Sequence, residues 1–144
     1  MAVTAGQKFP GYPYLQVEQN KSAAAWAAGD LVYVVSNTWA KNPTTATVQP
    51  YGVAAAARAS GDAKGEVILQ GVVAMTAGAA IGVGKFVMAD TTTAGRVKEL
   101  AGTAAGKIVG LYLGHVTEMD GKTAQTAAAA ADVVWILLMP GDNA

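Results

Sequence analysis

The sequence predicts an all-β protein: a single small β-barrel or sandwich-like domain, residues 29–144, preceded by an extended N-terminal arm, residues 1–28. From residue 29 onward, short apolar runs rich in β-branched residues alternate with clusters of Gly, Asp, Asn, Thr and Ser, which is typical of short strands joined by tight turns. The chain has 144 residues, the length of one domain with a core of its own. Before residue 29 the pattern differs, because aromatic residues are mixed with prolines.

The arm is recognised by the segment Phe9-Pro10-Gly11-Tyr12-Pro13-Tyr14. Its prolines fix the backbone in an extended form and cannot donate a hydrogen bond to a sheet. Ordering such an arm costs on the order of 20–40 kcal/mol of backbone entropy. Recovering about 30 kcal/mol by burial would need roughly 1,200 Å² of apolar surface at about 25 cal/mol per Å². We therefore expect a partner subunit to hold the arm, and expect that residues 1–20 can be deleted without unfolding the β domain.

Within the β domain, each strand is predicted from an apolar run bounded by turn residues. The strands are expected at residues 31–35, 48–57, 65–75, 85–90, 95–99, 107–116 and 132–139. Two alanine-rich stretches, 54–59 and 127–131, have high helix propensity but no amphipathic period. The first is interpreted as a strand that runs into a turn, and the second as a loop or a single helical turn.

A weak internal echo connects the two halves of the β domain. In each half a turn glycine precedes a strand, a second strand begins around a Gly, and a strongly apolar strand follows a polar turn. The spacings differ between the halves, but the order is the same and suggests two related β units wrapped around one core. The matching segments are Gly29–Val34 with Gly84–Ala89, Tyr51–Ala54 with Val109–Tyr112, and Glu66–Leu69 with Asp132–Leu137.

Composition argues against several classes of function. The chain has no Cys, and its 10 Lys and Arg balance 10 Asp and Glu without forming a basic cluster. Disulfides and thiolate metal sites are thereby excluded, and nucleic-acid binding is disfavoured. Hydrophobic residues make up 52% of the chain and charged residues 14%. A surface with so little charge predicts that part of it is buried against other subunits.

Membrane insertion and export are not expected either. The longest uninterrupted apolar run, residues 133–139, is much shorter than the roughly 20 residues that span a bilayer. The first residues lack the basic and apolar regions of a secretory signal, so synthesis and use without export are expected.

No motif predicts catalysis, a cofactor or a metal. The segment 78–86 resembles a phosphate-binding loop, but its glycine spacing is one residue too long and Phe86 stands where a hydroxyl is required. His115 is the only histidine and is interpreted as a residue at a strand end. The acids are mostly interpreted as solvated turn residues. We expect a protein that is not an enzyme.

The segments Gly29–Val34, Tyr51–Ala54, Gly65–Val73, Gly84–Val87 and Val109–Leu111 together resemble the capsid decoration (cement) proteins of tailed bacteriophages. The resemblance covers about residues 29–139. It implies a small β-barrel or β-tulip domain, often a homotrimer, that sits on the outer surface of the virion capsid and clamps neighbouring major capsid protein subunits. It carries no catalytic residues. The Thr-rich loop 42–47 and the segment 118–131 depart from the compact pattern.

The residues expected to contact the capsid or another partner are the aromatic and proline residues of the arm and one nearby tryptophan: Phe9, Pro10, Tyr12, Pro13, Tyr14 and Trp26.

Two other functions remain open. A carbohydrate-binding or host-adhesion module displayed on a virion would use Trp39 or Trp26 as a platform on which a sugar stacks. A small hydrolase would need two carboxylates about 5–9 Å apart in a cleft.

Overall fold

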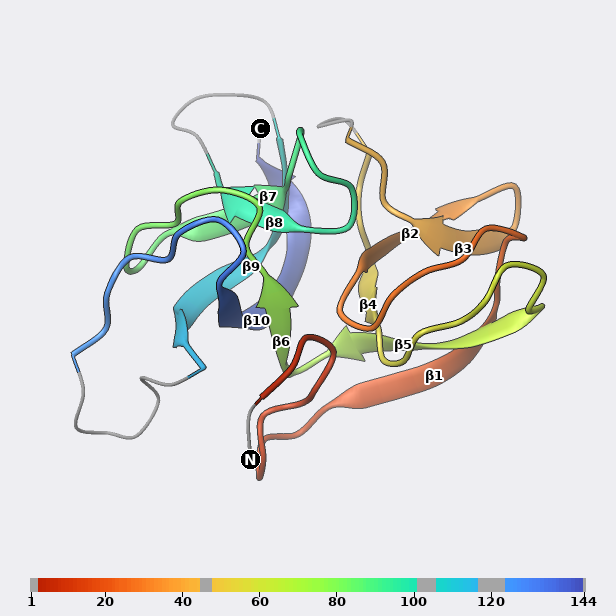
Figure 1. Ribbon diagram of the computed structural model, residues 1–144, viewed down its shortest axis with the longest axis horizontal. Helices are drawn as coiled ribbons and strands as arrows, with labels where there is room; N and C mark the ends of the chain where they lie inside the picture. Colours follow the sequence, from red (N-terminus) through yellow and green to blue (C-terminus); the bar gives the residue numbers. More distant parts are fainter. Residues whose placement is uncertain (1–2, 45–47, 101–105, 117–123, 144) are drawn as a thin grey trace.

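The computed structural model describes residues 3–44, 48–100, 106–116 and 124–143. Over these ranges the chain forms ten strands in two antiparallel sheets that lie side by side (Figure 1), which confirms the all-β prediction. No helix in this part of the chain is long and apolar enough to cross a membrane. The strands are β1 Leu15–Asn20, β2 Leu31–Val35, β3 Thr38–Lys41, β4 Gly52–Ala54, β5 Lys64–Gln70, β6 Val72–Thr76, β7 Phe86–Ala89, β8 Val97–Glu99, β9 Gly106–His115 and β10 Val133–Asn143.

The two sheets have the same topology. The first has the order β1-β5-β4-β2-β3, and the second has the order β6-β10-β9-β7-β8. The strand order of the second sheet is therefore obtained by adding five to each strand number of the first. We call residues 15–70 unit 1 and residues 72–143 unit 2. The internal echo in the sequence predicted two related β units, and the shared strand order confirms it.

Each sheet also closes on itself in the same way, by a contact between its first and last strands. In unit 1 the backbone N of Ser22 donates to the carbonyl O of Trp39 at 2.8 Å. In unit 2 the N of Gly78 donates to the O of Val97 at 2.7 Å. Because these contacts join the residues just after β1 to β3 and those just after β6 to β8, each sheet curls round into a small barrel-like unit.

One apolar residue fills the same place at the end of each barrel. Trp26 forms an antiparallel backbone pair with Arg58, and Ile81 forms the equivalent pair with Ala128. Both apolar side chains are buried, Trp26 with 3% of its surface exposed and Ile81 with none. The repeat thus extends from the strands to the segments that connect them.

A tight turn repeats as well. The backbone N of Ala59 donates to Oδ2 of Asp62 at 2.9 Å, and the N of Ala129 donates to Oδ2 of Asp132 at 2.8 Å. In both turns the residue before the aspartate has a positive φ, 90° at Gly61 and 73° at Ala131. These turns are the ends of the two alanine-rich stretches, so neither stretch forms a helix.

The hydrophobic core follows from the alternation of side chains along the strands. Val32, Ala54 and Val67 point into the barrel of unit 1 and pack with Trp26. The main core cluster fills unit 2 and also receives three residues from the other face of the first sheet. This shared cluster joins the two units. The three residues are Leu31, Val53 and Ile68.

The N-terminal residues lie on both units and contribute backbone pairs to each. Residues 15–20 form β1, which pairs with β5 along its length. Further upstream, the N of Gly6 donates to the O of Ala74 at 2.7 Å. Phe9 packs its ring against Trp135, with the ring centroids 5.0 Å apart.

This differs from the expectation that a partner subunit must hold the arm. The entropy estimate counted the side chains of the arm but not the backbone hydrogen bonds that it forms with the chain's own sheets. Because deletion of residues 1–20 would remove β1 and the cover over Trp135, we now expect that deletion to unfold the domain.

The observed strands refine the predicted ones. The run predicted at 48–57 is paired only at 52–54, and the run at 65–75 is divided by Gly71, whose φ is 121°. Two strands, β1 and β3, were not predicted. The turn before β3, Ser36-Asn37, has positive φ at both residues, which is typical of a two-residue hairpin.

Candidate functional site

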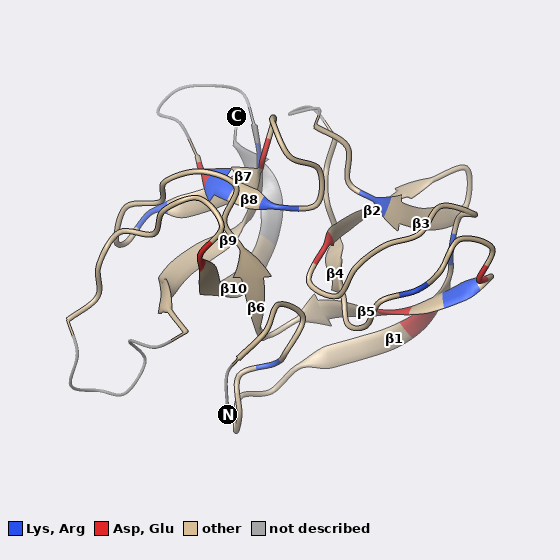
Figure 2. Ribbon diagram, in the orientation of Figure 1, with Lys and Arg blue, Asp and Glu red and all other residues tan. Residues whose placement is uncertain are grey.

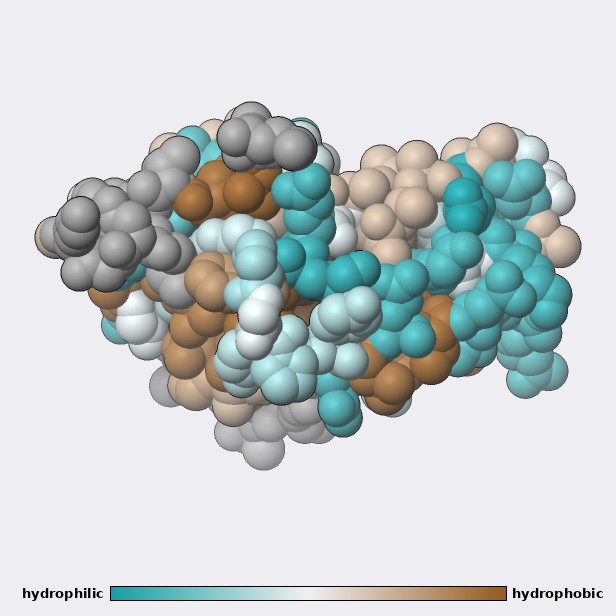
Figure 3. Space-filling model, turned by 90° about the horizontal axis from the view of Figure 1, so that it is seen from below, coloured by the Kyte–Doolittle hydropathy of each residue, from teal (hydrophilic) through white to brown (hydrophobic). Residues whose placement is uncertain are grey.

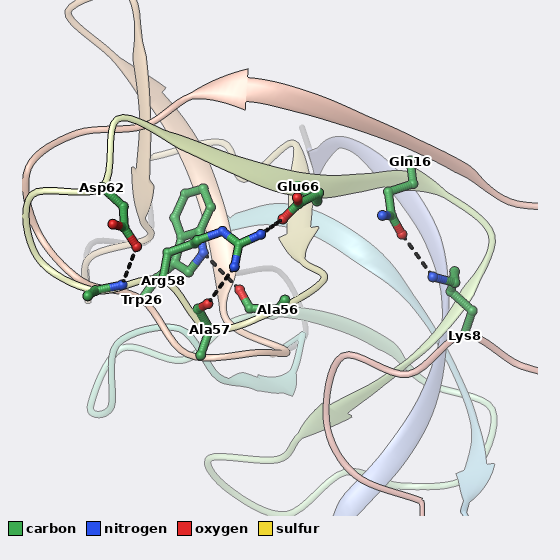
Figure 4. Close-up of polar contacts among 9 residues, drawn as sticks. Lys8, Gln16, Trp26, Ala56, Ala57, Arg58, Asp62 and Glu66 are labelled. Atoms are coloured by element: carbon green, nitrogen blue, oxygen red, sulfur yellow. Dashed lines mark hydrogen bonds and ion pairs between the residues drawn. The ribbon is translucent and has the colours of Figure 1, made fainter.

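The exposed aromatic loop, residues 10–14, is held between two paired segments of the chain. Before it, the N of Phe9 donates to the O of Val72 at 2.9 Å. After it, β1 begins at residue 15. Lys8 fixes the loop from the side, because its Nζ donates to Oε1 of Gln16 at 2.8 Å (Figure 4) and lies 4.6 Å from the ring centroid of Tyr14. An exposed loop anchored at both ends presents its side chains at a low cost in entropy.

The loop lies against the junction between the two units. A Cβ atom on Gly71 would come within 3.0 Å of the carbonyl O of Pro13 and within 2.9 Å of Cβ of Tyr14. Gly71 joins β5 to β6, so the absence of a side chain lets the loop approach the backbone at this point.

Next to the loop is a groove of about 830 Å³ that is open to solvent. Its walls come from the aromatic loop, from the residue before β4, from the β5–β6 junction and from β10. Most of the lining side chains are apolar, and Tyr12 and Tyr51 are about half exposed at its rim. The lining residues are Tyr12, Pro13, Tyr51, Leu69, Gln70, Gly71, Leu137 and Leu138.

The structure brings some of the predicted contact residues together on this surface and separates others from it. Pro10, Tyr12, Pro13 and Tyr14 are exposed, and Tyr12 and Pro13 line the groove. Phe9 is partly buried on Trp135.

Trp26, the sixth predicted contact residue, lies in the core. Its indole N donates to the O of Ala56 at 3.1 Å (Figure 4), and Nζ of Lys21 lies 5.6 Å from its ring. The prediction placed this side chain on the surface because it lies near a loop beside the first predicted strand, but it fills the end of the first barrel.

Sequence reasoning missed the groove residues outside the loop. Tyr51, Leu69, Leu137 and Leu138 lie in or beside predicted strands, where an apolar residue is ordinarily a core residue. One signal was available in Tyr51, a large aromatic residue between a proline and a glycine. Such a position is typical of a loop, so the side chain was a candidate for exposure.

The acids have structural roles throughout the described part of the chain. Glu18, Asp30 and Glu66 form ion pairs with Lys64, Lys41 and Arg58. The Arg58–Glu66 pair crosses from a connecting segment to β5 (Figure 4). Three aspartates accept hydrogen bonds from backbone N atoms within their own turns: Asp62 from residue 59, Asp90 from residues 92 and 93, and Asp132 from residue 129. Glu99, in β8, accepts one from the backbone N of residue 82.

His115 is the last residue of β9, and its Nε2 lies 3.1 Å from Oδ2 of Asp132. The prediction of a strand-end histidine is thus confirmed. The segment 78–86 forms a glycine turn that leads into β7, as predicted. Three or more His, Cys, Asp and Glu side chains do not gather into a metal-binding group anywhere in the described ranges. Glu118 and Asp120 lie outside them.

Of the two tryptophans proposed as a sugar-stacking platform, Trp26 does not fit that role. Trp26 is buried, and Trp39 is partly buried against the cluster inside unit 1.

Charge and hydropathy separate the two ends of the molecule. Charged residues occupy only short stretches of the two sheets, and most of both ribbons is uncharged (Figure 2). Seen from below, hydrophobic side chains gather over the half that contains unit 2 and near the centre, whereas the far end of unit 1 is hydrophilic (Figure 3). The groove lies where the units meet, between these two regions.

Neither a family model nor a curated protein sequence matches the chain. Its fold, however, is shared with solved structures of bacteriophage heads, which confirms the predicted relation at the level of the fold. One is a chain in the capsid of Myoviridae phage XM1, with a TM-score of 0.61 and 16% identity, covering 94% of this chain and 89% of that one. Another is the N base of head fiber gp8.5 of bacteriophage phi29, with a TM-score of 0.59 and 14% identity, covering 89% and 98%.

Proposed function

We propose that this chain is a non-catalytic structural protein of a bacteriophage virion. It binds the outer surface of the capsid and cements neighbouring major capsid protein subunits. The observation that supports this best is the exposed aromatic loop beside an apolar groove, on a domain whose fold is shared with a phage capsid chain and a head fiber base. Self-association, as a homotrimer, is part of the proposal.

The chemistry of the loop suits protein binding. Tyr and Pro side chains offer large contact areas and lose little conformational entropy on binding. None of the residues that line the groove is charged, so binding there desolvates no charged group of the lining. Many copies that each bridge several capsid subunits would resist opening of the shell even if each contact is weak.

The proposal is tested by measuring occupancy on capsid shells purified from the virus that encodes the chain. Wild-type protein is mixed with the shells, the shells are pelleted, and bound protein is counted. We expect the double variant Tyr12→Ser, Tyr14→Ser to lose binding by tenfold or more, because truncating interface anchors costs about 1–2 kcal/mol each.

The matched control is Val83→Ser. Val83 is 53% exposed, similar to Tyr14 at 54%, but lies in the segment before β7. Occupancy equal to that of the wild type is expected for this control. Absence of wild-type binding, or full binding of the double tyrosine variant, would contradict the proposal.

A further inference from the structure

The outer face of unit 1 carries a row of three apolar residues that the fold buries. Leu31 in β2 is paired with Val53 in β4, and Val53 is paired with Ile68 in β5. None of the three is more than 1% exposed, and all belong to the core cluster that is otherwise built mainly from unit 2. This row is therefore the surface by which unit 1 packs on its neighbouring unit.

Unit 2 carries the same row at equivalent positions. Phe86 in β7 is paired with Leu111 in β9, and Leu111 is paired with Leu137 in β10. All three are again apolar, but Phe86 is 42% exposed and the two leucines are partly exposed. Leu137 also packs against the cluster around Trp135, at the edge of the groove. At its Phe86 end, unit 2 thus presents the kind of surface that unit 1 buries, and no further unit covers it in the described part of the chain.

The packing of unit 2 on unit 1 shows what kind of element covers such an apolar row. In unit 1 the row lies under unit 2, and the N of Leu31 donates to the O of Gly95 at 2.9 Å. Gly95 belongs to the connection between β7 and β8. In unit 1 the equivalent connection is the β2–β3 turn. Just before it, Val34 and Val35 at the end of β2 are 45% and 37% exposed. This hairpin end also has no covering element in the described part of the chain.

We propose that the row of Phe86, Leu111 and Leu137 in one copy binds the β2–β3 hairpin of unit 1 in a second copy. The contact continues between chains the packing that joins the two units within a chain. It is head-to-tail, so it can close into a ring of copies. This inference names the surface of the self-association proposed above and rests on that part of the proposed function.

The experiment uses two full-length variants, Phe86→Asp and Val35→Lys, and measures molar mass by light scattering across the accessible concentration range. Wild-type protein should self-associate, and each variant alone should do so at least tenfold more weakly. An equimolar mixture should form a species of twice the monomer mass, because the Val35→Lys copy keeps an intact row and the Phe86→Asp copy keeps an intact hairpin. Recovery on mixing distinguishes this contact from a two-fold contact of row with row, which mixing cannot restore.

Circular dichroism establishes that each variant is folded, and Phe86→Ser replaces Phe86→Asp if the charge prevents folding. Tyr14→Ser, which changes the aromatic loop, should self-associate like the wild type. A monomeric wild type, unchanged association of either variant, or a mixture that stays monomeric would overturn the inference. Capsid occupancy is a separate measurement, so bound but monomeric wild type would overturn this contact and not the attachment to capsids.

Discussion

The two units have the same strand order and the same closing contacts, yet their outer faces differ in polarity. On unit 1 the outer positions of β1 and β5 include Glu18 and Glu66, and Arg58 pairs with Glu66. The equivalent positions on unit 2 are Ala74 and Trp135. Val3 and Phe9 cover this face of unit 2, whereas Glu18 on the equivalent face of unit 1 is exposed. The N-terminal segment therefore packs on the face that carries no charged residues, and not on the equivalent charged face of unit 1.

Apolar surface has two roles in the two units: packing of one unit on the other, and exposure to a partner. Equivalent rows on the two units are apolar, but over the described residues the row of unit 1 lies against the other unit and the row of unit 2 does not. Since a folded monomer rarely leaves a contiguous apolar patch without a role, the units differ in what remains for partners to bind. Mutations at equivalent positions of the two units can therefore test whether these positions have the roles assigned to them.

The residues that fill the barrel ends should give the largest effects. Trp26→Ala is expected to lower the free energy of unfolding by about 3–5 kcal/mol and Ile81→Ala by about 2–5 kcal/mol, because each leaves a cavity in a closed barrel. Urea unfolding followed by fluorescence and circular dichroism measures both. Since the shared core cluster joins the units, each variant should unfold in one transition; two separate transitions would show that the units fold independently.

The cover over unit 2 should give an intermediate effect. Phe9→Ala removes the ring that packs on Trp135 and is expected to cost about 1–3 kcal/mol. The tryptophan emission should shift to longer wavelength as Trp135 becomes solvated. Lys8→Ala is the control, because it changes the neighbouring residue without uncovering the ring. An unshifted emission in Phe9→Ala would contradict the assigned packing.

The repeated turn offers a pair of opposite substitutions. Gly61→Ala should lower the free energy of unfolding by about 1 kcal/mol, because an L-residue with positive φ is strained. Ala131→Gly should raise it by about 0.5 kcal/mol, because relief of about 1–2 kcal/mol of strain exceeds the added entropy of a glycine in the unfolded chain. Thermal unfolding measures both, and equal signs would contradict the equivalence of the turns.

The ion pair on unit 1 should matter least. Arg58 and Glu66 are about one-third exposed, so Arg58→Ala is expected to cost about 0.2–1 kcal/mol. Alanine is the residue at the equivalent position of unit 2, Ala128. The loss should disappear in high salt, where exposed ion pairs are screened. A loss that persists in high salt would mean that the aliphatic part of Arg58, and not its charge, stabilises unit 1.

The sequence allowed much of this fold to be predicted because its strongest signals are local. Apolar runs between turn residues located most strands, and the glycine before β2 and before β7 revealed the repeat. The strand β1 escaped prediction because Leu15–Asn20 alternates polar residues with only two apolar ones, and its pairing with β5 depends on residues 50 positions away. Such long-range pairing leaves little trace in the strand itself.

Part of the repeat cannot be seen in the sequence, because equivalent backbone groups in the two units are bound by different residue types at different positions. In unit 1 the N of Ala27 donates to a carboxylate at the start of β2, that of Asp30, at 2.8 Å. In unit 2 the N of Gly82, which is equivalent to Ala27, donates at 2.7 Å to Glu99, a carboxylate from β8. A comparison of residue types finds no match here, although the same backbone group is satisfied.

The sequence predicted the loop of the candidate site, residues 10–14, but not the residues from other strands that line the groove beside it. The aromatic and proline residues of the loop stand out in sequence, whereas the groove depends on how β4, β5 and β10 meet at Gly71. Trp26 was predicted to be exposed because nothing in the sequence shows that it fills the end of a barrel; that role depends on how the strands are placed in space. In both cases the missing information was the relative position of the two units.

The most direct test of the account is a cryo-electron microscopy reconstruction of capsid shells incubated with the purified chain. The account predicts density for this fold on the outside of the shell, over the boundaries between major capsid protein subunits, with the loop of residues 10–14 and its groove facing the shell. Shells without such density, or bound copies whose aromatic loop faces solvent, would contradict it.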